Sequence, residues 1–141
     1  EYFMVAVHDL CETTIIASNP STIPPIGSKS ISDFVFEGIP YDLKITNYFG
    51  GHTKEYVNKN KQNVVEQLLA GADVLRIREQ AKKTINNWGL NRFYVLVEDQ
   101  ERWFSHPEGI LDELIGEIKN MYKPMNTEIG GITISTQLIA I

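Results

Sequence analysis

The segment Ser32–Thr46 reads SDFVFEGIPYDLKIT and decides the fold, because apolar residues alternate with others on both sides of a turn. This alternation has the period of a half-buried strand. Glu37 and Gly38 separate the two runs and predict the two-residue turn of a β-hairpin. In that register Phe36 pairs with Ile39, Val35 with Pro40, Phe34 with Tyr41 and Asp33 with Asp42.

The hairpin would bring three charged side chains together on one face. Directly opposed β-carbons lie about 4.5–5.5 Å apart, so Asp33 and Asp42 would repel each other unless a cation lay between them. Lys44 follows Asp42 by two residues and shares its face. Mg²⁺ prefers one or two carboxylates together with water and phosphate oxygens. The spacing therefore predicts a divalent-cation site with a positive group beside it.

A bulged turn is the alternative to this register. Glu37 does not favour the positive φ that a two-residue turn requires, and Pro40 has no N–H to donate to a ladder. A slip of one residue would leave Asp33 near the strand of Asp42 without placing the two carboxylates opposite each other.

The remaining pattern predicts helices and buried strands around the hairpin. Apolar spacing predicts helices over 2–17, over 62–88 and from Pro107 to about residue 122. An almost wholly apolar run at 92–98 predicts a central strand, and 132–139 predicts the last strand. Residues 18–31 and 47–61 are predicted to be loops. The fold class is therefore α/β: one domain over 1–141 in three layers, with a mixed β-sheet flanked by helices.

Composition narrows the class of protein. The chain of 141 residues has no apolar run long enough to span a membrane, so no membrane partner is expected. The single cysteine, Cys11, cannot form an internal disulfide and favours a reducing, cytoplasmic setting. His8, His52 and His106 lack the spacing of a zinc site, although distant histidines can meet in a fold. The net charge of −5 counts mildly against a nucleic-acid binder. Glu1 in place of Met is compatible with a fragment of a longer chain.

The residues of the hairpin resemble those of a known family. Asp33, a short turn and then Asp42-Leu43-Lys44 on a strand are similar to the motif of the PD-(D/E)xK nuclease superfamily, which has the restriction-endonuclease-like fold. Type II restriction endonucleases are the members that it resembles most. The resemblance implies that Asp33 and Asp42 bind Mg²⁺, for which Mn²⁺ can substitute, and that Lys44 assists the nucleophile.

The resemblance also implies a glutamate on the helix before the hairpin that serves as a catalytic residue and metal ligand. Glu12 is the residue that fits, and Asp9 is the second choice. The sequence departs from the family in two places. Ser32 stands where the family has proline, and the Pro-rich segment 18–31 does not show the strand that the family places before the hairpin.

The function implied is a Mg²⁺-dependent endonuclease that hydrolyses DNA phosphodiester bonds, with DNA as partner and a homodimer as assembly. Two other functions stay open: a catalytically inactive nuclease-fold domain that serves protein or nucleic-acid interaction, and another phosphoesterase such as an RNA nuclease. A solvated polar strand face would also explain Asp42 and Lys44, since acidic-x-Lys triplets occur by chance. Glu117-Ile118-Lys119 is a second such triplet in this chain.

Overall fold

The computed structural model describes residues 2–19, 22, 33–71, 91–99, 101–121, 123–129 and 131–141, with the backbone alone for 2–5. The elements in chain order are α1 (Tyr2–Ser18), β1 (Phe34–Phe36), β2 (Ile39–Asn47), α2 (Lys54–Lys59), α3 (Lys61–Ala70), β3 (Arg92–Val97), α5 (Arg102–Ser105), α6 (Pro107–Lys119), β4 (Met125–Ile129) and β5 (Ile132–Ala140). None of the described helices is both long and apolar enough to cross a membrane.

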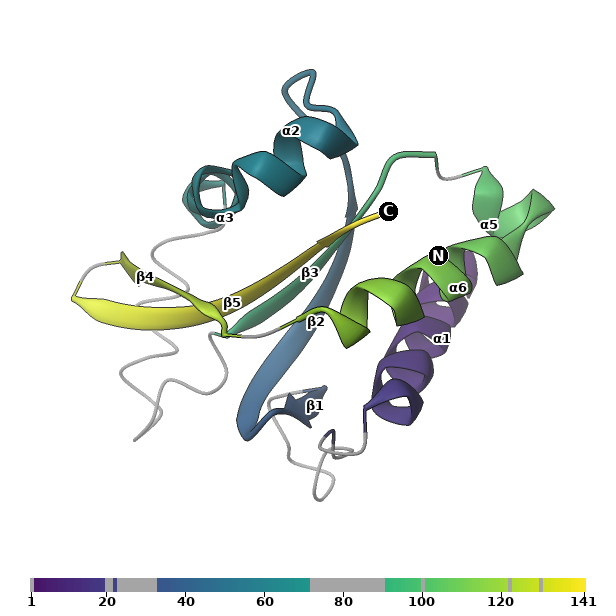
Figure 1. Cartoon of the computed structure of the whole chain (residues 1–141), viewed down its shortest axis with the longest axis horizontal. Helices are drawn as coiled ribbons and strands as arrows, with labels where there is room; N and C mark the ends of the chain where they lie inside the picture. Colours follow the sequence, from purple (N-terminus) through teal and green to yellow (C-terminus); the bar gives the residue numbers. More distant parts are fainter. Residues whose placement is uncertain are drawn as a thin grey trace.

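The strands form one open, mixed sheet in the order β1-β2-β3-β5-β4. The three middle strands are parallel, and β1 and β4 pair antiparallel at the two edges. Helices α2 and α3 lie on one side of the sheet, while α1, α5 and α6 lie on the other (Figure 1). The predicted mixed α/β architecture with flanking helices is confirmed.

The hairpin adopts the predicted register, with Phe34 opposite Tyr41, Val35 opposite Pro40 and Phe36 opposite Ile39. Glu37 and Gly38 have φ values of 51° and 81°, as a two-residue type I′ turn requires. The bulged alternative is therefore wrong. Proline fits because the second pair from such a turn exchanges no hydrogen bonds, so no N–H is needed there.

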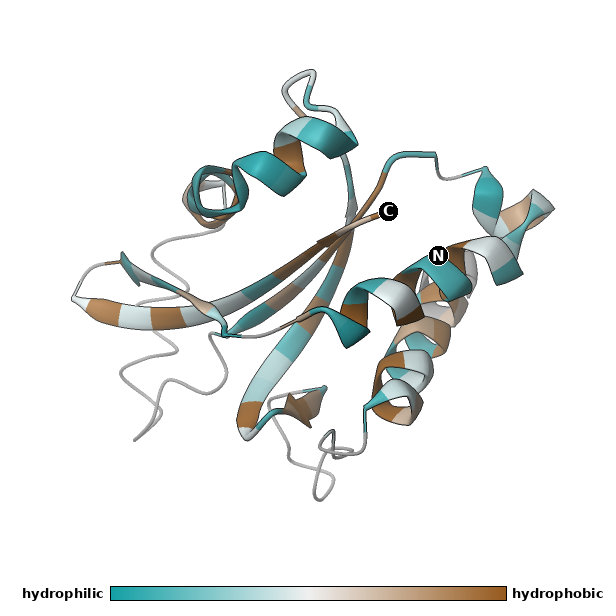
Figure 2. Cartoon of the chain, in the orientation of Figure 1, coloured by the Kyte–Doolittle hydropathy of each residue, from teal (hydrophilic) through white to brown (hydrophobic). Residues whose placement is uncertain are grey.

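The middle strand of the sheet, β3, is buried on both faces. On the α1 and α6 side, Phe93 makes edge-to-face contacts with Phe34, Phe36 and Tyr41, whose ring centroids lie 5.3, 5.6 and 5.7 Å away. On the other side, Tyr94 and its neighbours in the sheet pack with apolar residues of α2 and α3. Hydrophobic residues accordingly dominate β3 in Figure 2. This confirms that β3 is a central strand.

Three features differ from the prediction. The expected loop 47–61 contains α2, whose first turn is capped by the Thr53 hydroxyl accepting the Tyr56 N–H at 3.1 Å. Strand β4 was not predicted, because MNTEI has only five residues and three of them are polar. The four-residue helix α5 was also not predicted. The predicted helix 62–88 is confirmed as α3 up to Ala70, and its remainder lies outside the described residues.

Asn91, which comes directly before β3, links β3 to its two neighbouring strands, β2 and β5. Its side chain donates to the Pro40 carbonyl at 3.1 Å and accepts the Ser135 N–H at 2.9 Å. Its own carbonyl accepts the Asp42 N–H at 3.0 Å. The backbone of Asp42 is thereby held by a residue that is 6% exposed.

Candidate metal centre

Asp33, Asp42 and Lys44 line one cavity of about 380 Å³ at the edge of β2. The pairing of β2 with β1 ends at Tyr41, and the cavity lies along the following residues of β2. Helix α1 contributes His8 and Asp9 to the lining. The structure thus brings together the three motif residues that the hairpin predicted, and adds residues from α1.

Asp33 lies directly before β1, and the ladder of β1 and β2 ends at the pair of Phe34 and Tyr41, so it does not include the expected pair of Asp33 with Asp42. The Asp33 N–H donates to the Tyr41 carbonyl at 2.8 Å, and its Oδ2 accepts the Leu43 N–H at 2.7 Å. The Leu43 carbonyl accepts the Nε2 proton of His8 at 3.1 Å. Both main-chain groups of Leu43 are therefore satisfied by side chains, and Nε2 of His8 also lies 3.5 Å from Asp33 Oδ2.

Two cations flank Asp42. Lys44 Nζ lies 3.1 Å from Asp42 Oδ2, and Arg92 Nη1 lies 3.7 Å from the same oxygen. The side chain of Lys44 is 51% exposed, whereas that of Arg92 is 13% exposed. Sequence reasoning missed Arg92, since its place beside Asp42 follows from the parallel register of β2 and β3.

The two carboxyls of the pair have pKa values that diverge. Burial alone would raise the pKa of Asp33, but hydrogen bonds from His8, Asp42 and Leu43 outweigh burial and lower it to about 2. The pKa of Asp42 is raised, first by burial and then by its hydrogen bond with Asp33, against the opposing charge of Lys44. Two carboxyls close enough to share a proton are the arrangement that a bound cation would relieve.

Glu12, the predicted glutamate, reaches the site through His8, with Oε2 lying 3.8 Å from His8 Nδ1. Burial and the charge of Asp33 raise the pKa of Glu12. Asp9 lines the cavity itself, and ligand atoms of His8, Asp9 and Glu12 lie within 4.8 Å of one another. The pKa of His8 is raised mainly by its hydrogen bond with Asp33.

Sequence reasoning did not place His8 at the site. The only signal was its spacing of four residues from Glu12, which puts both side chains on one face of α1. The contact of His8 with Leu43 spans 35 positions in sequence. Its place in the site therefore depends on how α1 packs against the sheet, which no local pattern specifies.

The donor set fits a hard divalent cation. Asp33 and Asp42 offer carboxylate oxygens, and the Leu43 carbonyl faces the same group of side chains through its contact with His8. Carboxylate and carbonyl oxygens are the ligands that Mg²⁺ and Mn²⁺ take in proteins. Asp33, Asp42 and the Leu43 carbonyl are therefore the groups that would hold such an ion.

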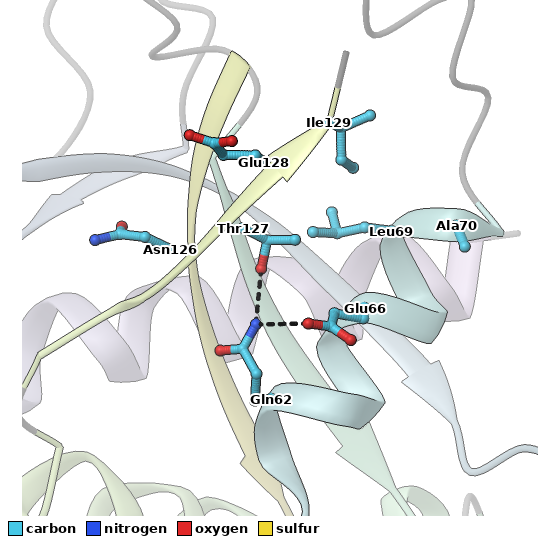
Figure 3. A pocket seen from close by; sticks show the side chains of 8 residues that line it. All are labelled: Gln62, Glu66, Leu69, Ala70, Asn126, Thr127, Glu128 and Ile129. Carbon is cyan, nitrogen blue, oxygen red and sulfur yellow. Dashed lines mark hydrogen bonds between the residues drawn. The ribbon is translucent and has the colours of Figure 1, made fainter. Parts of the chain in front are cut away.

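A second cavity of about 460 Å³ lies between α3 and the edge strand β4. In Figure 3 the side chain of Gln62 points toward Thr127 and Glu66, donating to Thr127 at 3.1 Å and to Glu66 at 3.3 Å. Its described lining includes the carboxylates Glu66 and Glu128 but no histidine, lysine or arginine. The first cavity is therefore the better candidate for chemistry.

No family model matches the chain, and no curated protein or solved structure matches it either.

Proposed function

We propose that this chain is a divalent-cation-dependent endonuclease domain of the restriction-endonuclease-like type, which hydrolyses phosphodiester bonds of DNA. The observation that supports it most is the meeting of Asp33, Asp42 and Lys44 on one cavity. Two carboxylates with a lysine beside them are what hydrolysis of a phosphodiester by a bound cation needs. Mg²⁺ is the cation expected from the motif.

Four residues of the site, Asp33, Asp42, Lys44 and Arg92, have parts in this chemistry. A bound cation supplies a Lewis acid that polarises the phosphoryl group and lowers the pKa of water. Asp33 and Asp42 would hold the cation, and Arg92 on the neighbouring strand would keep the Asp42 carboxylate oriented. Lys44, half exposed at the cavity, orients the attacking water or stabilises the charge that develops on the phosphate.

The test is cleavage of supercoiled plasmid DNA in the presence of Mg²⁺. Asp42→Asn and Lys44→Met should each lower the rate by about a hundredfold or more, because each removes a charge at the reacting group. Lys59→Met is the matched control, since Lys59 forms a similar exposed ion pair with Glu55 on α2 at 2.8 Å. Circular dichroism should show that all three variants fold. Cleavage at the wild-type rate by both site variants would refute the proposal.

A non-catalytic nuclease-fold domain is the second candidate. The bonds of Asp33 and His8 to Leu43 favour it, because they give both residues a structural role without any metal. The net charge of −5 also favours it. No cleavage of duplex DNA, branched DNA or RNA, together with no calorimetric signal at about millimolar Mg²⁺ or Mn²⁺, would establish this candidate. Cleavage of RNA alone would instead assign a ribonuclease.

A further inference from the structure

His8 reaches the metal centre from α1, although the proposed chemistry gives it no task. Its Nε2 lies 3.1 Å from the Leu43 carbonyl oxygen and 3.5 Å from Asp33 Oδ2. Both of these oxygens belong to the donor set of the cation. A cation bound by these oxygens would therefore lie close to the His8 imidazole as well.

The spacing of these atoms suits shared coordination. Ligand atoms at about 2.1 Å from an octahedral ion lie about 3 Å from each other when they are adjacent. The distances from His8 Nε2 to Leu43 O and to Asp33 Oδ2, 3.1 and 3.5 Å, are close to that value. An ion that takes the place of the Nε2 proton would contact all three atoms after small movements.

The other side of the imidazole ring has the partner that a metal-bound histidine normally has. Histidines that bind metals through one nitrogen donate the other N–H to a carboxylate or carbonyl, which fixes the ring and its tautomer. Glu12 Oε2 lies 3.8 Å from His8 Nδ1, one helical turn along α1. In this arrangement Glu12 orients His8 and is not itself a ligand.

We propose that His8 is a nitrogen ligand of the cation held by Asp33, with Glu12 orienting its ring, and that the centre therefore prefers Mn²⁺ or Co²⁺ to Mg²⁺. The inference rests on the proposed cation site. Imidazole suits transition ions, whereas Mg²⁺ takes oxygen ligands and gives up its waters reluctantly. Replacing His8 should therefore weaken the binding of Mn²⁺ more than that of Mg²⁺.

The experiment is electron spin-echo spectroscopy of Mn²⁺ bound to the full chain, prepared without a histidine tag. The wild type should show modulation from a directly bound ¹⁴N nucleus, and His8→Gln, which keeps an N–H donor for Leu43, should lose it. His106→Gln is the control, because that histidine is exposed and contacts Ser105. By calorimetry, His8→Gln should weaken Mn²⁺ binding by about tenfold and Mg²⁺ binding by less.

A second variant keeps the test decisive if His8→Gln does not fold. The chain has three histidines, so His52→Gln combined with His106→Gln leaves His8 as the only imidazole, and the ¹⁴N signal should persist. If Mn²⁺ binds the wild type without ¹⁴N modulation, the role of His8 is overturned. Loss of that binding in Asp42→Asn would still support the cation site. No Mn²⁺ binding at all would overturn both.

Discussion

Asp33 serves two purposes with one carboxylate. Its Oδ2 accepts the Leu43 N–H at the point where β1 ends, and it faces the cavity in which a cation would sit. An oxygen with two lone pairs can do both. A change of Asp33 therefore affects the fold and the chemistry together, which is why Asp42 and Lys44 are the cleaner residues for activity tests.

Replacing Asp33 separates these two purposes. Asp33→Ala leaves the N–H of the buried residue Leu43 without its acceptor. The free energy of unfolding should therefore fall by about 1–3 kcal/mol. Asp33→Asn keeps an oxygen for that N–H and should cost clearly less, while its neutral side chain should weaken the binding of Mn²⁺. Urea unfolding followed by fluorescence measures the difference, and equal losses for both variants would contradict the hydrogen-bond role.

Cys11 provides a test of the packing of α1. Its side chain is fully buried, and burial raises the pKa of the thiol to about 12. A raised thiol pKa means that the fold favours the neutral form. The contribution of this preference to the free energy of unfolding is complete below pH 9.0, the ordinary pKa of the thiol. It is lost as the pH rises toward 12. At about pH 8, Ellman's reagent should react with the unfolded chain and scarcely with the folded one. Fast reaction of the folded protein would show that α1 does not pack as described.

At the scale of elements, local patterns predicted the hairpin, helices α1 and α6 and strands β3 and β5, but not every element. Period-two alternation around Glu37-Gly38 predicted the register correctly, because a one-residue slip would turn Phe34 and its neighbours out of the core. Helix α2 and strand β4 escaped prediction, since both are short and their sequences are largely polar. The places of His8 and Arg92 at the site also escaped prediction, since they depend on how α1 and β3 pack beside β2.

Substitutions of two glycines, one in the hairpin turn and one in α6, should change the stability in opposite directions. Gly38 has φ of 81°, and a β-carbon added there would meet nothing within 4 Å, so Gly38→Ala should cost about 1 kcal/mol from backbone strain alone. Gly116 lies exposed inside α6 with similar open space, so Gly116→Ala should stabilise by about 0.5–1 kcal/mol. Thermal unfolding measures both changes, and stabilisation by Gly38→Ala would mean that the turn is not of this type.

At the scale of the whole molecule, the candidate metal centre combines residues from separate parts of the sheet and from one covering helix. Asp33 and Asp42 come from the hairpin, Arg92 from the next strand, and His8 from α1. Residues that lie far apart in sequence are thereby held by one folded core. The chain carries a net charge of −5, so a cation that neutralises the paired carboxylates would also favour the approach of a phosphate backbone.

The most direct test of this account is the position of a bound cation. Crystals of the chain soaked in Mn²⁺ should show an anomalous scattering peak within bonding distance, about 2.0–2.4 Å, of carboxylate oxygens from both Asp33 and Asp42. Crystals of Asp42→Asn under the same conditions should lose that peak. A saturating soak of the wild type that leaves these oxygens without a peak, or places Mn²⁺ only elsewhere, would contradict the central claim.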